Sequence, residues 1–133
     1  MTRYMLDTNI ISDLIRNPNG KAAKRIADAG NDNICTSIIV AAELRYGSVK
    51  NGSKRLLRLV EGLLEEIEVL SFEAPADVAY GAIRSELESA GKPIGANDLL
   101  IAAHARAISA IVVTANVSEF ARVRGLKVEN WLA

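Results

Sequence analysis

The stretch Tyr4-Met5-Leu6-Asp7-Thr8-Asn9 decides the fold of this chain. Its apolar run stops abruptly at an acid, which predicts a short first strand at residues 4–6. Residues 9–16 then carry apolar side chains at the spacing of one helix face, namely Ile10, Ile11, Leu14 and Ile15. A strand that passes directly into a helix is the first half of a βαβ unit, so this stretch predicts an α/β fold.

The same alternation of strands and helices continues along the chain. We expect further strands at residues 33–36, 68–72, 111–113 and 127–129. We expect helices at residues 21–29, 37–49, 54–66 and 74–90, and one from Ala96 or Asn97 to Ala107. Short strands alternating with helices favour a mostly parallel sheet that is covered on both faces. The prediction is therefore a three-layer α/β architecture in a single domain, residues 1–133.

The composition excludes several classes of protein. Half of the residues are hydrophobic and 24% are charged, which excludes an unfolded polar chain. The 16 Lys and Arg balance the 16 Asp and Glu, so only a local patch could indicate a nucleic-acid partner. Cys35 is the lone cysteine, and the N-terminus lacks a signal-type apolar core, so we expect a cytoplasmic protein. No apolar stretch is long enough for a membrane span.

Polar residues follow two of the predicted strands. In parallel sheets, ligands collect outside the carboxyl ends of the strands. Asp7 follows the first strand, and Thr114-Ala115-Asn116 follows the strand at residues 111–113. A purely structural role is equally open for both, since Asp is a favoured helix N-cap and Asn a common turn residue.

Two further acids lie on predicted helices. Glu43 shares a helix face with Ile39 and Tyr46, which we expect to be the packed face. A buried glutamate needs a partner, so Glu43 belongs either to a salt bridge or to a functional site. Asp98 falls in the first turn of its helix, where the helix dipole alone would favour an acid.

Together, Asp7, Glu43 and Asp98 are candidates for one metal site. Converging carboxylates repel each other unless a proton or a cation intervenes. Oxygen ligands without a His or Cys cluster favour Mg²⁺ or Mn²⁺ over zinc, and such ions assist phosphodiester hydrolysis. We expect His104, the lone histidine, to be a packed or surface residue that points away from Asp98.

Basic residues are unevenly distributed along the chain. Residues 44–60 hold five of them and no acid, and a second cluster comprises Arg122, Arg124 and Lys127. Contact with a phosphate backbone would explain this pattern, but solvated charged surfaces would explain it equally well.

Four blocks of the sequence, in order, resemble the PIN-domain ribonucleases, in particular the VapC toxins of bacterial toxin–antitoxin pairs. The blocks are residues 4–12, 42–47, 93–105 and 113–126, and Glu129-Asn130-Trp131 is similar to the family's ending. The resemblance implies a short, mostly parallel sheet of about five strands between helices.

The resemblance also implies a site and an activity. Asp7, Glu43 and Asp98 would bind Mg²⁺ or Mn²⁺, and Thr8 and Asn116 would orient water or phosphate while RNA is cleaved to a 5′-phosphate and a 3′-hydroxyl. Other PIN domains often carry a fourth acid where Asn116 stands. This departure leaves open whether one metal or two bind, and whether Glu119 compensates.

The implied partners are an RNA substrate, a cognate VapB-type antitoxin and a second copy of the chain. We expect the helices at residues 37–49 and 54–66 to form an apolar groove, which an apolar antitoxin helix could fill. The RNA and its cleavage site are not indicated by the sequence.

The main alternative is a non-catalytic PIN-like interaction domain that binds a regulatory cation. Metal-dependent release of RNA fragments would separate the two hypotheses. An aspartate-nucleophile phosphatase is disfavoured, because Asn9 stands where that chemistry usually has a second acid.

Overall fold

The computed structural model describes residues 2–133, and Met1 lies outside the described residues. These residues contain a five-stranded sheet in the order β3-β2-β1-β4-β5, and each neighbouring pair of strands is parallel. The strands are β1 (Tyr4–Leu6), β2 (Ile34–Ser37), β3 (Glu68–Leu70), β4 (Ile111–Val113) and β5 (Val128–Glu129). The predicted α/β fold with a parallel sheet of about five strands is confirmed.

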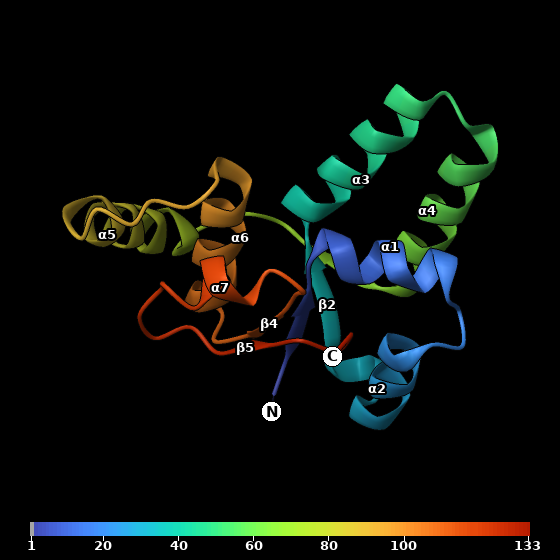
Figure 1. Cartoon of the computed structure of the whole chain (residues 1–133), viewed down its shortest axis with the longest axis horizontal. Helices are drawn as coiled ribbons and strands as arrows, with labels where there is room; N and C mark the ends of the chain where they lie inside the picture. The colour runs from blue at the N-terminus through green and yellow to red at the C-terminus, as the bar shows by residue number, and fades with distance from the viewer. Residues whose placement is uncertain (1) are drawn as a thin grey trace.

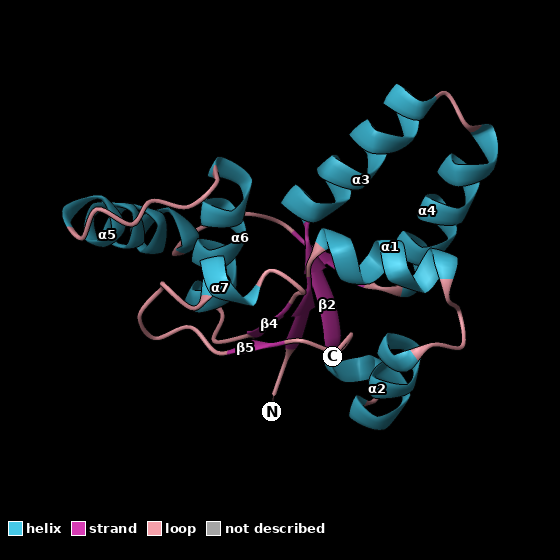
Figure 2. Cartoon of the chain, viewed as in Figure 1, coloured by secondary structure: helices cyan, strands magenta, loops and turns pink. Residues whose placement is uncertain are grey.

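Helices cover both faces of the sheet (Figures 1 and 2). They are α1 (Thr8–Arg16), α2 (Lys21–Ala29), α3 (Ile38–Asn51), α4 (Lys54–Glu66), α5 (Ala76–Ser89), α6 (Ala96–Ala107) and α7 (Val117–Phe120). In the view of Figure 1, α5, α6 and α7 lie to the left of the sheet and α1, α3 and α4 to the right. Among residues 2–133, no helix combines the length and the apolar character needed to cross a membrane.

Side-chain caps explain where several helices begin. Ser37 accepts a hydrogen bond from the N–H of Ile39 at the start of α3, and Ser53 accepts one from Leu56 at the start of α4. Gly52 ends α3 in the left-handed conformation, with φ +66°, which costs glycine little. The helix predicted at 37–49 therefore runs from Ile38 to Asn51, while α2 and α4 have the predicted bounds.

Several boundaries differ from the sequence-based predictions by one or two residues, and three of these differences have a structural explanation. The helix α5 begins at Ala76 and not at residue 74, because Pro75 occupies the non-helical N-cap position. The strand β3 ends at Leu70, and Phe72 leaves the sheet to pack edge-on against His104, with ring centroids 5.6 Å apart. A short 3₁₀ turn, Asn31–Asn33, precedes β2 and was not predicted, so β2 begins one residue later than expected.

The core lies against the two central strands. Met5 and Leu6 of β1 and Val112 and Val113 of β4 are fully buried. The helix α6 packs close to them through buried small residues, Ala102, Ala103 and Ala105. Dense packing on both sides fixes the backbone at the carboxyl ends of β1 and β4, where the polar residues of interest begin.

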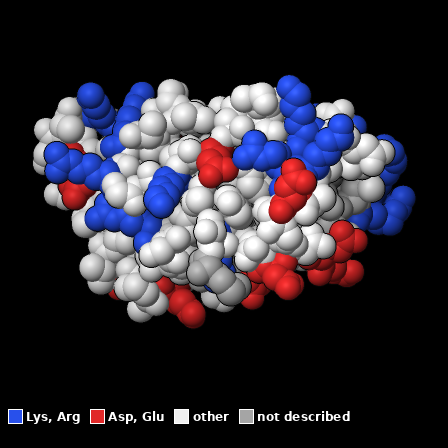
Figure 3. Space-filling view, turned by 90° about the horizontal axis from the view of Figure 1, so that it is seen from below, with Lys and Arg blue, Asp and Glu red and all other residues white. Residues whose placement is uncertain are grey.

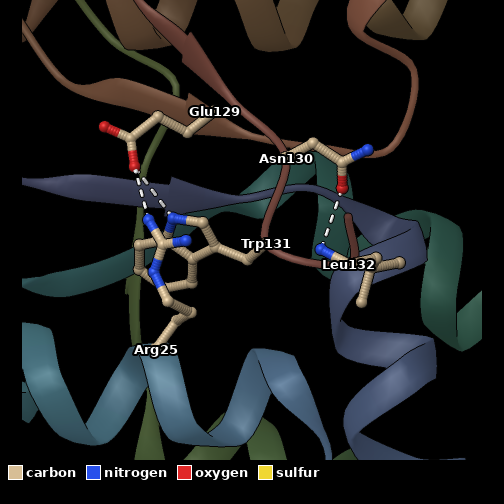
Figure 4. Close-up of polar contacts among 5 residues, drawn as sticks. All are labelled: Arg25, Glu129, Asn130, Trp131 and Leu132. Carbon is tan, nitrogen blue, oxygen red and sulfur yellow. Dashed lines mark hydrogen bonds and ion pairs between the residues drawn. The ribbon is translucent and has the colours of Figure 1, made fainter.

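The C-terminal segment is tied to α2 (Figure 4). The indole of the buried Trp131 donates to Glu129 Oε1 at 2.9 Å, and the Arg25 guanidinium contacts the same oxygen at 3.3 Å. Arg25 also lies 5.3 Å from the Trp131 ring centroid. Trp131 also packs on Tyr4 of β1, with ring centroids 5.0 Å apart, so the segment after β5 is held between the sheet and α2.

Candidate active site

Asp7 lies between β1 and α1 and is 3% exposed. Its Oδ1 accepts the N–H of Thr8 at 2.8 Å and so caps α1. Its Oδ2 accepts the Thr114 hydroxyl at 2.8 Å. Burial is the main reason that the pKa of Asp7 is raised, and the charge of Glu43 adds to it. The capping role and a site role are therefore compatible, because they use different oxygens.

Asn9 and Thr114 hold the β1 and β4 ends together around Asp7. Asn9 Oδ1 accepts the N–H of Ala115 at 2.9 Å, and Asn9 Nδ2 lies 3.3 Å from the Thr114 hydroxyl. Thr114 is fully buried and also accepts the N–H of Asn116. Thr114 was expected at this edge as part of the polar run after β4, but its contact with Asp7 and the role of Asn9 were not predicted, because these contacts span more than 100 positions of sequence.

Glu43 of α3 is half-buried and reaches the same edge. Its Oε1 accepts the Thr8 hydroxyl at 3.0 Å, and its Oε2 accepts the Asn97 amide at 3.1 Å. The salt-bridge alternative for Glu43 is wrong, since no Lys or Arg among residues 2–133 pairs with it.

The predicted packed face of α3 is also wrong. Tyr46 is 66% exposed, and the buried positions are Val40, Ala41, Leu44 and Ser48. Because α3 carries apolar residues all around, including the exposed Ile38 and Val49, hydrophobic spacing could not identify its packed face.

Asp98 of α6 meets two residues of the segment after β4. The Asn116 amide donates to Asp98 Oδ2 at 3.0 Å and to Glu119 Oε2 at 2.6 Å. Glu119 Oε1 in turn accepts the N–H of Gly95, immediately before α6. Glu119 therefore lies within reach of the site, and no side-chain cap bond explains Asp98.

Carboxylates without an ion-pair partner among residues 2–133 characterise this edge of the sheet. Burial, then the neighbouring carboxylates of Glu119 and Asp7, raise the pKa of Asp98 to about 7. The Gly95 N–H is the main reason that the pKa of Glu119 is lowered. No Lys or Arg in the described chain forms an ion pair with Asp7, Glu43, Asp98 or Glu119.

The cluster is open and not a closed metal cage. Within residues 2–133, no three Asp, Glu, His or Cys side chains lie close enough to enclose a metal ion. The donor chemistry nevertheless fits Mg²⁺ or Mn²⁺, because every candidate ligand is an oxygen. Magnesium usually keeps several waters and binds through one or two carboxylates, so it needs no closed cage.

His104 is buried outside the cluster, as predicted for a packed residue. Its Nδ1 lies 2.8 Å from Ser37 Oγ, and burial lowers its pKa. Since Ser37 caps α3, His104 supports the helix that carries Glu43.

The comparison with known families decides the classification. The sequence profile of the PIN domain matches residues 4–126. The chain belongs to the PIN-domain family. Curated PIN-domain relatives cover it almost completely. It is 39% identical over 132 residues to the tRNA(fMet)-specific endonuclease VapC of Shigella flexneri, covering 98% of this chain and 99% of the relative. It is 40% identical over 134 residues to the ribonuclease VapC2 of Haemophilus influenzae, covering 99% and 100%.

Solved structures agree with this membership. VapBC2 from Rickettsia felis, bound to a DNA fragment from its promoter, matches with a TM-score of 0.88 and 39% identity, over 98% of this chain and 99% of the other. DNA-bound VapBC from Salmonella typhimurium matches with a TM-score of 0.90 and 37% identity, over 98% and 99%. The predicted resemblance to VapC-type PIN domains is confirmed.

Proposed function

We propose that residues 1–133 act as a single PIN domain with metal-dependent endoribonuclease activity, as the cytoplasmic toxin of a toxin–antitoxin pair. One observation carries the proposal: carboxylates from separate elements share one edge of the sheet, and no Lys or Arg of residues 2–133 forms an ion pair with them. Such charge is unfavourable in the free protein and is relieved by a divalent cation. The ribonuclease names of the relatives support RNA as substrate and disfavour the non-catalytic alternative.

The metal ion, Mg²⁺ or Mn²⁺, would be held by Asp7, Glu43 and Asp98. Glu119 would supply the fourth carboxylate, because an amide, Asn116, stands where other PIN domains often carry an acid. When bound, the ion would activate water and neutralise charge on the phosphodiester. Whether one ion or two bind depends on Glu119, which Asn116 joins to Asp98 through its amide.

The surrounding residues would hold the acids in place. Thr8 and Asn97 each donate to one oxygen of Glu43, so the Glu43 carboxylate has a fixed orientation. Thr114 does the same for Asp7. Asn116 uses its amide nitrogen on the acids, which leaves its carbonyl oxygen to orient water or phosphate. Hydrolysis at this site would leave a 5′-phosphate and a 3′-hydroxyl.

A groove beside the site is suited to an antitoxin. It has a volume of about 360 Å³ and lies between α1, α3 and α4, with apolar walls from Ile15, Leu44, Leu56 and Val60. Thr8 and Glu43 lie at its edge, so an occupant could reach the acids directly. We propose that a VapB-type antitoxin binds here and blocks the site, which the solved VapBC complexes support. We also propose a homodimer.

Incubation of the purified chain with labelled RNA tests the activity. We expect cleavage with millimolar Mg²⁺ or Mn²⁺, no cleavage with excess chelator, and fragments that carry 5′-phosphates. Cleavage that persists unchanged in chelator would contradict the metal-dependent mechanism. Sequencing the 5′-phosphate ends after a pulse of expression would identify the RNA.

A further inference from the structure

Three basic side chains share one surface hollow, and one of them, Arg122, lies near Glu119 of the candidate site. Lys92, Arg122 and Arg124 are exposed and line a surface hollow of about 460 Å³. Figure 3 shows Lys and Arg at both ends of the molecule, one of which is the end that α5, α6 and α7 form. None of the three pairs with an acid in the described chain, and Glu86, which shares the hollow, lies 4.0 Å from Arg106 instead. Their charge is therefore available to a ligand.

Backbone contacts connect this hollow to the candidate active site. Arg122 donates to the carbonyl of Pro93 at 3.0 Å, two residues before the Gly95 N–H that Glu119 accepts. The positive charge of Arg122 contributes to the lowered pKa of Glu119. Arg106 donates to the Arg124 carbonyl at 3.0 Å and so fixes the backbone that carries Arg124. Arg122 therefore lies near Glu119 without forming an ion pair with it, and Lys92 and Arg124 share its hollow.

We propose that Lys92, Arg122 and Arg124 form a subsite for the RNA backbone that holds phosphates flanking the scissile bond. The proposal rests on the ribonuclease function above and adds the residues that position the substrate. The hollow is lined by no aromatic side chain, so it does not stack bases. The subsite contacts the phosphates of the RNA. It therefore fixes the position of the RNA along the site but does not discriminate between bases.

The other basic cluster, on α3 and α4, is less suited to this role. Arg45 is already bound to Glu61 through two hydrogen bonds of 2.7 and 2.8 Å. Lys54, Arg55 and Arg58 are exposed on α4 and do not line the hollow beside Glu119. They provide a matched control, because replacing all three changes the net charge by the same amount.

The test is RNA binding in the presence of chelator, where no cleavage contributes. Fluorescence anisotropy of labelled single-stranded RNA is recorded between 50 and 200 mM salt for the wild type and for Lys92→Gln/Arg122→Gln/Arg124→Gln. Each lost phosphate contact reduces the slope of log affinity against log salt by about 0.7, so the slope becomes shallower by about 2. The ratio of wild-type affinity to triple-variant affinity for RNA is therefore roughly 20-fold smaller at 200 mM salt than at 50 mM salt. The control Lys54→Gln/Arg55→Gln/Arg58→Gln keeps the wild-type slope.

A second variant separates the loss of phosphate contacts from a structural effect of removing the Arg122 side chain. Lys92→Gln/Arg124→Gln leaves the Arg122 contact with Pro93 intact, and its slope becomes shallower by about 1.4. An unchanged slope in both variants would overturn the subsite, and so would an equal change in the control. The proposal would also be overturned if the variants bound RNA like the wild type but bound the antitoxin more weakly, because the three basic side chains would then contact a protein partner and not RNA. A wild type that binds RNA through this patch but never cleaves would refute the ribonuclease function and retain the subsite.

Discussion

At the scale of single residues, Asp98 best separates a metal site from a helix cap. Its pKa is raised to about 7, so the folded state favours the protonated form. The stabilisation associated with that proton is complete below the unfolded pKa near 4 and is lost as the pH rises through about 7. Without metal, the wild type therefore loses stability across this range, because a charge forms on a partly buried carboxyl that also lies next to Glu119 and Asp7.

The first prediction concerns Asp98→Asn in chelator. Because the variant cannot acquire this charge, it should be more stable than the wild type at pH 7.5. After allowance for solvent screening, we expect the free energy of unfolding of the variant to exceed that of the wild type by about 1–2 kcal/mol. Near pH 4 the difference should vanish. Melting curves at both pH values measure it.

Asp77→Asn is the matched control, since Asp77 is an exposed acid in the first turn of α5. If Asp98 served only the helix dipole, both variants would be mildly destabilised at pH 7.5. That outcome would contradict the shared electrostatic site.

At the scale of secondary-structure elements, caps and buried apolar runs made much of the fold predictable. The predicted bounds of α4 and of β4, an apolar run that is buried throughout, are the observed ones, and Ser53 caps α4 in the structure. The edge strand β3 was harder, because its half-exposed residues form no distinct apolar pattern. The candidate acids could be predicted from their positions after strands and from the family resemblance. The contacts of Glu119, Asn9 and Thr114 could not be predicted from the sequence, because they depend on how separate loops meet.

The second prediction concerns the groove formed by α1, α3 and α4. Leu56→Asp should weaken inhibition by the antitoxin at least 10-fold, because the new carboxylate would be buried in an apolar contact. RNA cleavage by the free chain should be retained. Titration of cleavage with purified antitoxin measures both effects.

Leu59→Asp is the control, because Leu59 is 39% exposed and does not line the groove. Equal inhibition of the Leu56 variant and the wild type would place the antitoxin elsewhere.

At the scale of the whole molecule, opposite charges are separated although the net charge is zero. Acids collect at the carboxyl edge of the sheet. At the end formed by α5, α6 and α7 lie Lys92, Arg122 and Arg124, which form no ion pair within residues 2–133. A cation that binds only the folded cluster must stabilise the entire fold.

The third prediction follows from this linkage. At a Mg²⁺ or Mn²⁺ concentration about 100 times its Kd, the fold should gain about 2.7 kcal/mol. For a domain of this size the gain corresponds to a Tm increase of roughly 5–15 °C. Asp98→Asn should show a smaller increase. Melting curves with chelator and with metal measure the shift, and an identical Tm in both conditions would argue against a metal site.

The fourth prediction tests the central claim, that the carboxylates at the sheet edge perform the cleavage. The measurement is the rate of RNA cleavage in Mg²⁺ by Asp7→Asn, Glu43→Gln and Asp98→Asn, beside Asp77→Asn and His104→Ala. Each site variant removes one charge with little change in volume, and we predict a loss of at least about 100-fold with the fold intact. Asp77→Asn should cleave like the wild type, and His104→Ala should remain active. A fully active Asp98→Asn together with an inactive His104→Ala would contradict the account.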